Sequence, residues 1–132
     1  PGIGCPVISS LTGTDAAVLV TEPTPSGLHD LERVADLCRH FTIPIGVIVN
    51  KADLNPEATE AVQGWCAAEK ADFLGALPYD PAVTEAMVRR QAVTEFSDNG
   101  LSAPIRIVWS KIIELMQRTR SPRMAVTAFP VK

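Results

Sequence analysis

Asn50 and Asp53 are the two side chains of this chain whose types and spacing best suit contact with a nucleotide base. They lie in the tetrapeptide Asn-Lys-Ala-Asp, directly after the apolar run Ile-Gly-Val-Ile-Val at residues 45–49. A side-chain amide donates and accepts hydrogen bonds and a carboxylate accepts them, so the pair can contact the edge of a purine while the Lys51 stem covers its face. The alternative is an Asx turn that leads into a capped helix, for which the same residue types are usual.

A second candidate segment, Pro78-Tyr79-Asp80, follows the next apolar run at residues 73–77. The carboxyl ends of parallel strands meet at one edge of an α/β sheet, where ligands bind, so this segment would form another wall of the same base pocket. The alternative is a helix capped by Asp80 that begins at Pro81. The two interpretations are compatible with each other.

Gly2 and Gly4, near the start of the sequence, are candidates for contact with a terminal phosphate. Their backbone N–H groups carry no side-chain obstruction, which a close approach to phosphate requires. A flexible end of the chain is the equally good alternative. The sequence contains no Gly-rich loop followed by lysine that would hold the other phosphates, so no catalytic residue is predicted.

The composition is that of a globular domain with 132 residues, of which 46% are hydrophobic and 20% charged. The net charge of −3 argues against general binding to nucleic acid or to a membrane surface. The widely spaced Cys5, Cys38 and Cys66 form no C-x-x-C pair, so neither a disulfide framework nor a metal ligand set is predicted. No apolar run approaches the roughly 20 residues of a membrane span, so a cytoplasmic protein is expected. Its thiols are expected to be reduced.

Apolar runs that alternate with amphipathic stretches predict β-α-β units. Strands are expected at residues 16–21, 45–49 and 73–77, each covered on both faces because each is continuously apolar. Helices are expected at about 26–41, 56–70, 81–90 and 102–118, with a polar loop at 91–101. The fold class is therefore α/β, with three layers and a parallel sheet with right-handed crossovers. Residues 1–118 would form the domain and residues 119–132 a mobile tail.

The amphipathic stretches also predict which side chains enter the core. The residues expected to face inward are Leu28, Leu31, Val34, Ala35, Cys38, Phe41, Ala58, Ala61, Val62, Trp65, Cys66, Ala68, Val83, Ala86, Met87, Arg90 by its stem, Ile105, Val108, Trp109, Ile112, Leu115 and Met116.

Four segments, taken in order and spacing, closely resemble the C-terminal half of the MinD/ParA/Mrp-like P-loop ATPases, in the branch with an inserted ferredoxin domain. They are Pro-Gly-Ile-Gly-Cys-Pro-Val at 1–7, Thr-Glu-Pro-Thr-Pro-Ser-Gly-Leu-His-Asp-Leu at 21–31, Asn-Lys-Ala-Asp-Leu-Asn at 50–55 and Leu-Pro-Tyr-Asp-Pro at 77–81. The resemblance covers roughly residues 1–118. It implies a deviant Walker A ATPase whose two subunits face each other across ATP.

The resemblance also implies roles for single residues. Asn50 would read adenine, the segment from Pro78 to Asp80 would form the opposite wall of the base pocket, and residues 24–26 would lie near the nucleotide or the dimer face. Gly2 and Gly4 would end the Asp-Gly-Pro-Pro-Gly switch segment. ATP and Mg²⁺ would bind to the full-length parent and [4Fe–4S] clusters to its missing part, with no cofactor held by this chain alone.

The sequence thus predicts a fragment of a cytosolic ATPase that supplies the base-binding wall and the switch segment, in a homodimeric protein linked to iron–sulfur or redox chemistry. Without the phosphate-binding lysine, the fragment alone is expected to be inactive as a hydrolase. Half of a GTPase metallochaperone is an alternative, because such proteins use the Asn-Lys-x-Asp pattern with Asp53 as the guanine acceptor. A non-catalytic α/β module that dimerises through a bare sheet edge is a third hypothesis.

Overall fold

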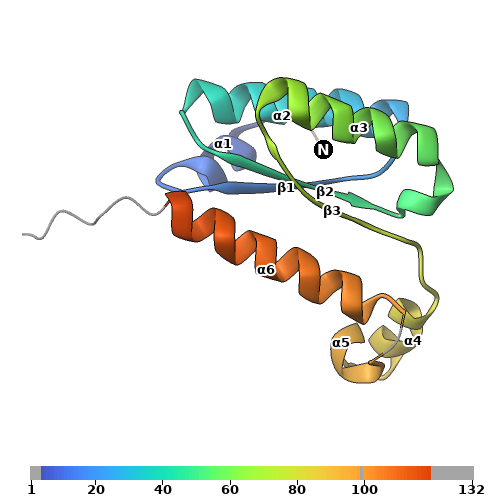
Figure 1. Ribbon diagram of the computed structural model, residues 1–132. Coiled ribbons are helices and arrows are strands. Elements are labelled where there is room, and N and C mark those ends of the chain that lie inside the picture. The colour runs from blue at the N-terminus through green and yellow to red at the C-terminus, as the bar shows by residue number, and fades with distance from the viewer. Residues whose placement is uncertain (1–3, 99, 120–132) are drawn as a thin grey trace, which may run out of the picture.

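The computed structural model of this chain describes residues 4–98 and 100–119, and these form a three-layer α/β unit (Figure 1). A parallel sheet lies in the middle, with α1 (Cys5–Leu11), α2 (Pro25–His40) and α3 (Pro56–Glu69) on one face and α6 (Ser102–Thr119) on the other. This arrangement confirms the predicted fold class. Gly2 and all of the predicted tail beyond Thr119 lie outside the described residues.

The sheet has the strand order β1-β2-β3, and all its strands are parallel. The strands are β1 (Ala17–Thr21), β2 (Ile45–Asn50) and β3 (Asp72–Leu77). Thr21 pairs with Val49, and Asn50 pairs with Leu77, so the three strands end at the same edge of the sheet. That edge brings together the loops in which the candidate base-binding residues lie.

The two longest helices that follow strands begin where local capping signals predict. Thr24 precedes Pro25 and accepts a hydrogen bond from the Gly27 backbone N–H at 3.0 Å. Asn55 precedes Pro56 and accepts one from the Ala58 N–H, also at 3.0 Å. In each case the cap satisfies a backbone donor that the first helical turn leaves without a partner.

The chain between β3 and α6 is more structured than the sequence predicted. After α4 (Ala82–Val88), the predicted polar loop contains a further short helix, α5 (Val93–Phe96). Figure 1 shows α4 and α5 at the end of the molecule beyond the carboxyl ends of the strands. Because α4 lies away from the sheet, Met87 is exposed and the prediction that it faces the core is wrong.

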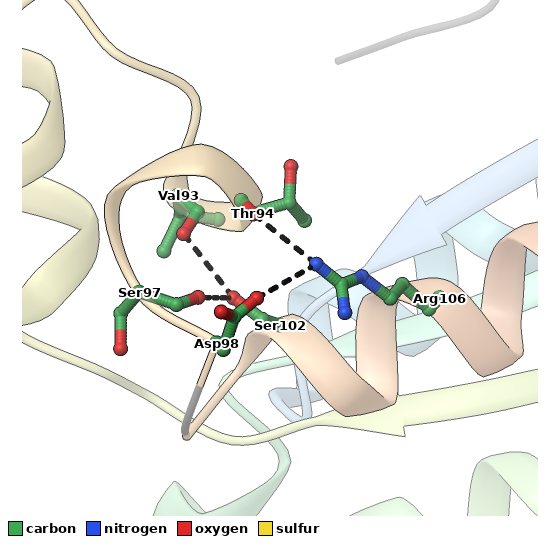
Figure 2. Close-up of polar contacts among 6 residues, drawn as sticks. All are labelled: Val93, Thr94, Ser97, Asp98, Ser102 and Arg106. Atoms are coloured by element: carbon green, nitrogen blue, oxygen red, sulfur yellow. Dashed lines mark hydrogen bonds and ion pairs between the residues drawn. The ribbon is translucent and has the colours of Figure 1, made fainter.

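A polar cluster joins α5 to the start of α6 (Figure 2). The fully buried Ser102 donates its hydroxyl to the carbonyl oxygen of Val93 at 3.2 Å and also to that of Ser97. Arg106 bonds to Asp98 Oδ1 at 3.1 Å. These bonds hold the first turns of α6 against α5 and the two residues that follow α5.

The larger core lies between the sheet and helices α1 to α3, and it contains the fully buried Val47 and Val49. On the other face, α6 packs over β2 and β3 through Val108 and Leu115. The buried residues of α3 are Val62 and Cys66, whereas the predicted core residues Ala61 and Ala68 are exposed. Phe41 and Arg90, which were also predicted to face inward, are exposed as well.

Strand β1 is covered on one face only, contrary to expectation. Val18 and Val20 are 39% and 64% exposed, because α6 lies over the other two strands. Trp109 and Met116, which were predicted to be in the core, are likewise 60% and 52% exposed. Only part of the apolar face of α6 therefore contacts the sheet.

Burial changes the acidity of the two core thiols, on Cys38 and Cys66. Desolvation raises the pKa of Cys66 from its ordinary value of 9.0 to about 11. It raises the pKa of Cys38 as well, against a smaller opposing effect of Arg39. Both thiols therefore stay protonated at neutral pH, since burial disfavours the thiolate.

We expect the free energy of unfolding to fall by about 2 kcal/mol between pH 9 and pH 11, because the Cys66 thiol ionises first in the unfolded chain. Stability from this group is complete below the unfolded pKa and is lost as the pH rises through the folded one. Guanidinium unfolding at several alkaline pH values measures the decline. It should be shallower in Cys66→Ala and unchanged in Cys5→Ala, whose thiol is exposed. Equal slopes in both variants would contradict the assignment to Cys66.

Within the part of the chain that the structure describes, no helix is both long and apolar enough to cross a membrane.

Candidate functional site

A hollow of about 210 Å³ lies at the carboxyl ends of β2 and β3. It is lined by Asn50, Lys51, Pro78, Tyr79, Asp80, Val83, Thr84 and Leu101. Pockets for whole drug-sized ligands occupy about 300–1,000 Å³, so this hollow has the size for a fragment such as a base. The structure thus brings together the four residues that were predicted from two separate loops, Asn50, Pro78, Tyr79 and Asp80.

Asn50 is the residue in the hollow best placed to recognise a ligand. It ends β2, pairs with Leu77 in the sheet and is half-buried. Among residues 4–98 and 100–119, its side-chain amide has no hydrogen-bond partner. A rigid strand therefore presents one donor and one acceptor group that a ligand can use.

Asp53 lies beside the hollow and does not line it. Its Oδ1 accepts a hydrogen bond from the Tyr79 backbone N–H at 2.5 Å. Asp53 belongs to a short 3-10 turn, Ala52–Leu54, which follows Lys51 in a left-handed conformation with φ of 53°. The carboxylate thereby joins the loop after β2 to the loop after β3.

Asp80 is also bonded to backbone. Its Oδ1 accepts a hydrogen bond from the Ala82 N–H at 2.9 Å, and its Oδ2 accepts one from the Leu101 N–H at 3.2 Å. The prediction that Asp80 caps a helix beginning at Pro81 is wrong, because α4 begins at Ala82, with Pro81 as its N-cap and no side-chain cap. Gly100 makes this second contact possible, because a Cβ there would lie 2.7 Å from Asp80 Oδ2 and its φ is +64°. Asp80 thus holds the start of α6 at the hollow.

Lys51 reaches across to the end of β1. Its Nζ lies 2.7 Å from Glu22 Oε1, and the hydrogen bond and charge of Glu22 raise the pKa of the Lys51 ammonium. Both side chains are well exposed, so the pair contributes little to stability. Since the ammonium is paired with Glu22, the part of Lys51 that remains available to a ligand is its stem.

The other predicted residues lie elsewhere. Gly4 is the N-cap of α1 and does not line the hollow, and Gly2 is outside the described residues. Thr24 and Ser26 line a separate groove of about 700 Å³ between β1 and α2. The structure therefore brings Asn50 and Pro78–Asp80 together at the hollow, whereas Gly4, Thr24 and Ser26 lie apart from it.

Sequence reasoning missed the wall made by Val83, Thr84 and Leu101. Leu101 is distant in the chain from Asn50, and its apolar side chain carries no chemical signal. The residue types Asp-Asn-Gly at positions 98–100 are typical of turns, and this was the one local signal in the sequence that the start of α6 could return to the site.

The thiols do not fit an iron–sulfur centre. Cys38 and Cys66 are buried in the larger core, and Cys5 is exposed on α1. No group of three or more His, Cys, Asp or Glu side chains in residues 4–98 and 100–119 is arranged to hold a metal ion.

Sequence comparison finds curated proteins that are similar to parts of this chain. A cytosolic Fe–S cluster assembly factor Nubp1 homolog from Drosophila grimshawi is 31% identical over 110 residues, which cover 74% of this chain and 35% of that protein. An uncharacterized protein of Methanocaldococcus jannaschii, MJ0578, is 34% identical over 55 residues, covering 42% of this chain and 20% of that protein. No family model matches the chain.

Among solved structures, the MinD cell division protein of Aquifex aeolicus is similar to this chain with a TM-score of 0.63 and 21% sequence identity. The match covers 76% of this chain and 44% of that one. The chain spans 20% and 35% of the lengths of the two curated relatives.

Proposed function

We propose, on the premise that this chain has the fold of the MinD/ParA-like P-loop ATPases, that the hollow beside Asn50 binds the adenine of ATP. The observation that carries the proposal is the Asn50 amide, which is free of partners within the described residues and lines a hollow of base size. An asparagine amide pairs with adenine through its amino group and a ring nitrogen. The Tyr79 side chain, which is half-exposed, and the Lys51 stem are placed beside the same base.

The position of Asp53 favours adenine over guanine. Bidentate recognition of guanine by a carboxylate uses both oxygens as acceptors. Asp53 does not line the hollow, and its Oδ1 is held toward the Tyr79 N–H, with which it forms a hydrogen bond. The GTPase alternative therefore has less support than the ATPase.

The chain would supply one part of an ATP site within a longer protein. Its sequence has no Gly-x-x-x-x-Gly-Lys motif, so another segment would hold the phosphates and Mg²⁺ and would position the attacking water. The similarity to Nubp1 homologs supports a role in cytosolic Fe–S cluster assembly, with the clusters held outside this chain. Two copies that face each other across ATP would be the working form.

Titration of the chain with adenosine, ATP and guanosine, followed by NMR, tests this function. Adenosine and ATP should bind equally tightly, because the hollow contacts only the base, and guanosine at least about tenfold more weakly. The Asn50 side-chain amide signals should shift with adenosine. Equal binding of guanosine, or no shift at Asn50, would contradict the proposal. Light scattering of the same samples with Mg²⁺-ATP tests the homodimer, which a constant monomer mass would exclude.

A further inference from the structure

The loop that carries Asp53 is itself held firmly at two points. The Leu54 N–H donates to the Lys51 carbonyl at 3.1 Å and closes the turn. The Thr59 hydroxyl donates to the Ala52 carbonyl at 2.9 Å and ties this turn to α3. The Asp53 carboxylate therefore projects from a braced turn, and its direction is set by the backbone around it.

The segment that Asp53 contacts is held from the other side by Asp80. Asp53 Oδ1 bonds to the Tyr79 N–H, and Asp80 Oδ2 bonds to the Leu101 N–H. Two hydrogen bonds thus tie the Pro78–Asp80 wall of the hollow to other parts of the chain: the Tyr79 N–H bonds to Asp53 in the loop after β2, and the wall's own Asp80 carboxylate bonds to Leu101 at the start of α6.

We propose that Asp53 is a positioning residue, whose carboxylate sets the width of the base hollow by holding the Tyr79 backbone and does not touch the base itself. This inference rests on the proposed function, since it assigns a role in the same hollow. Asn50 then reads the base, and Asp53 fixes the distance between the loop of Asn50 and the wall that faces it. The acceptor at position 53 matters more than its charge.

Two substitutions separate this role from direct recognition. Asp53→Asn keeps an acceptor oxygen for the Tyr79 N–H and removes the charge, whereas Asp53→Ala removes both. Glu60→Ala is the matched control, because Glu60 is an exposed carboxylate on α3 that does not line the hollow. Each variant is titrated with adenosine, guanosine and xanthosine, and hydrogen exchange of the Tyr79 amide is measured without ligand.

Asp53→Ala should speed Tyr79 exchange and weaken adenosine binding, each by about tenfold. Asp53→Asn should change both by less than about threefold and leave the purine preference unaltered. Glu60→Ala should match the unmodified chain.

Three results would overturn the proposal. The first is a gain of xanthosine binding in Asp53→Asn, since an asparagine amide donates to the xanthine oxygen where a carboxylate accepts from guanine. The second is unchanged Tyr79 exchange in Asp53→Ala, which would remove the structural tie. The third is the absence of purine binding by the unmodified chain, combined with faster Tyr79 exchange in Asp53→Ala. That result would refute the proposed function and would leave the hydrogen bond between Asp53 and Tyr79 supported.

Discussion

Gly46→Val is expected to lower the free energy of unfolding by about 3 kcal/mol, the largest stability loss among the changes considered. Gly46 lies in the central strand β2, where α6 approaches the sheet. A Cβ at this position would lie 2.6 Å from Leu74 Cδ1 and 2.9 Å from Leu115 Cδ2. Both leucines are almost completely buried, so neither has free space into which it can move. Accommodating valine requires α6 to shift away from the sheet.

The matched control for this substitution is Gly64→Ala. Gly64 lies in α3, where a Cβ would meet no atom within 4 Å. Because alanine favours the helix, the control should gain about 0.5–1 kcal/mol. Guanidinium denaturation of the two variants beside the unmodified chain measures both effects. A Gly46→Val variant as stable as the unmodified chain would contradict the close packing of Leu74 and Leu115 against Gly46.

Asn50→Ala is expected to weaken adenosine binding by about 10- to 100-fold, since a well-placed bidentate contact to a base contributes about 1–3 kcal/mol. The substitution removes the amide that is free of partners within the described residues. Stability should change little, because the side chain ends the strand and is half-buried. Adenosine titration followed by NMR, with urea denaturation of the same sample, separates binding from folding.

Asn55→Ala provides a control of the same residue type five positions later. The Asn55 side chain accepts a hydrogen bond from the Ala58 N–H and caps α3. Its loss should cost about 1 kcal/mol of stability and leave the affinity for adenosine unchanged. If Asn50→Ala lowered stability and kept full affinity, Asn50 would be a turn residue and the proposed base contact would be refuted.

The polar side chains in the loops at the site have two different roles, one structural and one in recognition of a ligand. The carboxylates of Asp53 and Asp80 accept hydrogen bonds from backbone N–H groups, and Asn50 keeps its amide for a ligand. The sequence placed all three residues at the carboxyl ends of neighbouring strands. It did not distinguish among their roles, because the donors that two of them use lie in other segments of the chain.

The residues of α6 that are buried are likewise fewer than the helical pattern of its sequence predicts. The helical period correctly grouped Val108 and Leu115 with Trp109 and Met116 on one broad apolar face. The first two are buried and the last two are exposed. The period of a helix identifies residues that share a face, but the width of the buried stripe depends on how much of the sheet lies beneath it.

By itself the sequence determined the alternation of strands and helices, the cap at Asn55, a choice between Thr24 and Ser26 for the cap of the preceding helix, and the end of the sheet at which candidate residues would meet. These features depend on local periodicity and on hydrogen bonds between residues three positions apart. Only the tertiary structure decided that Leu101 closes the hollow and that Asp53 holds Tyr79, which is 26 residues away. Contacts over such separations depend on how whole elements pack, which no short stretch of sequence encodes.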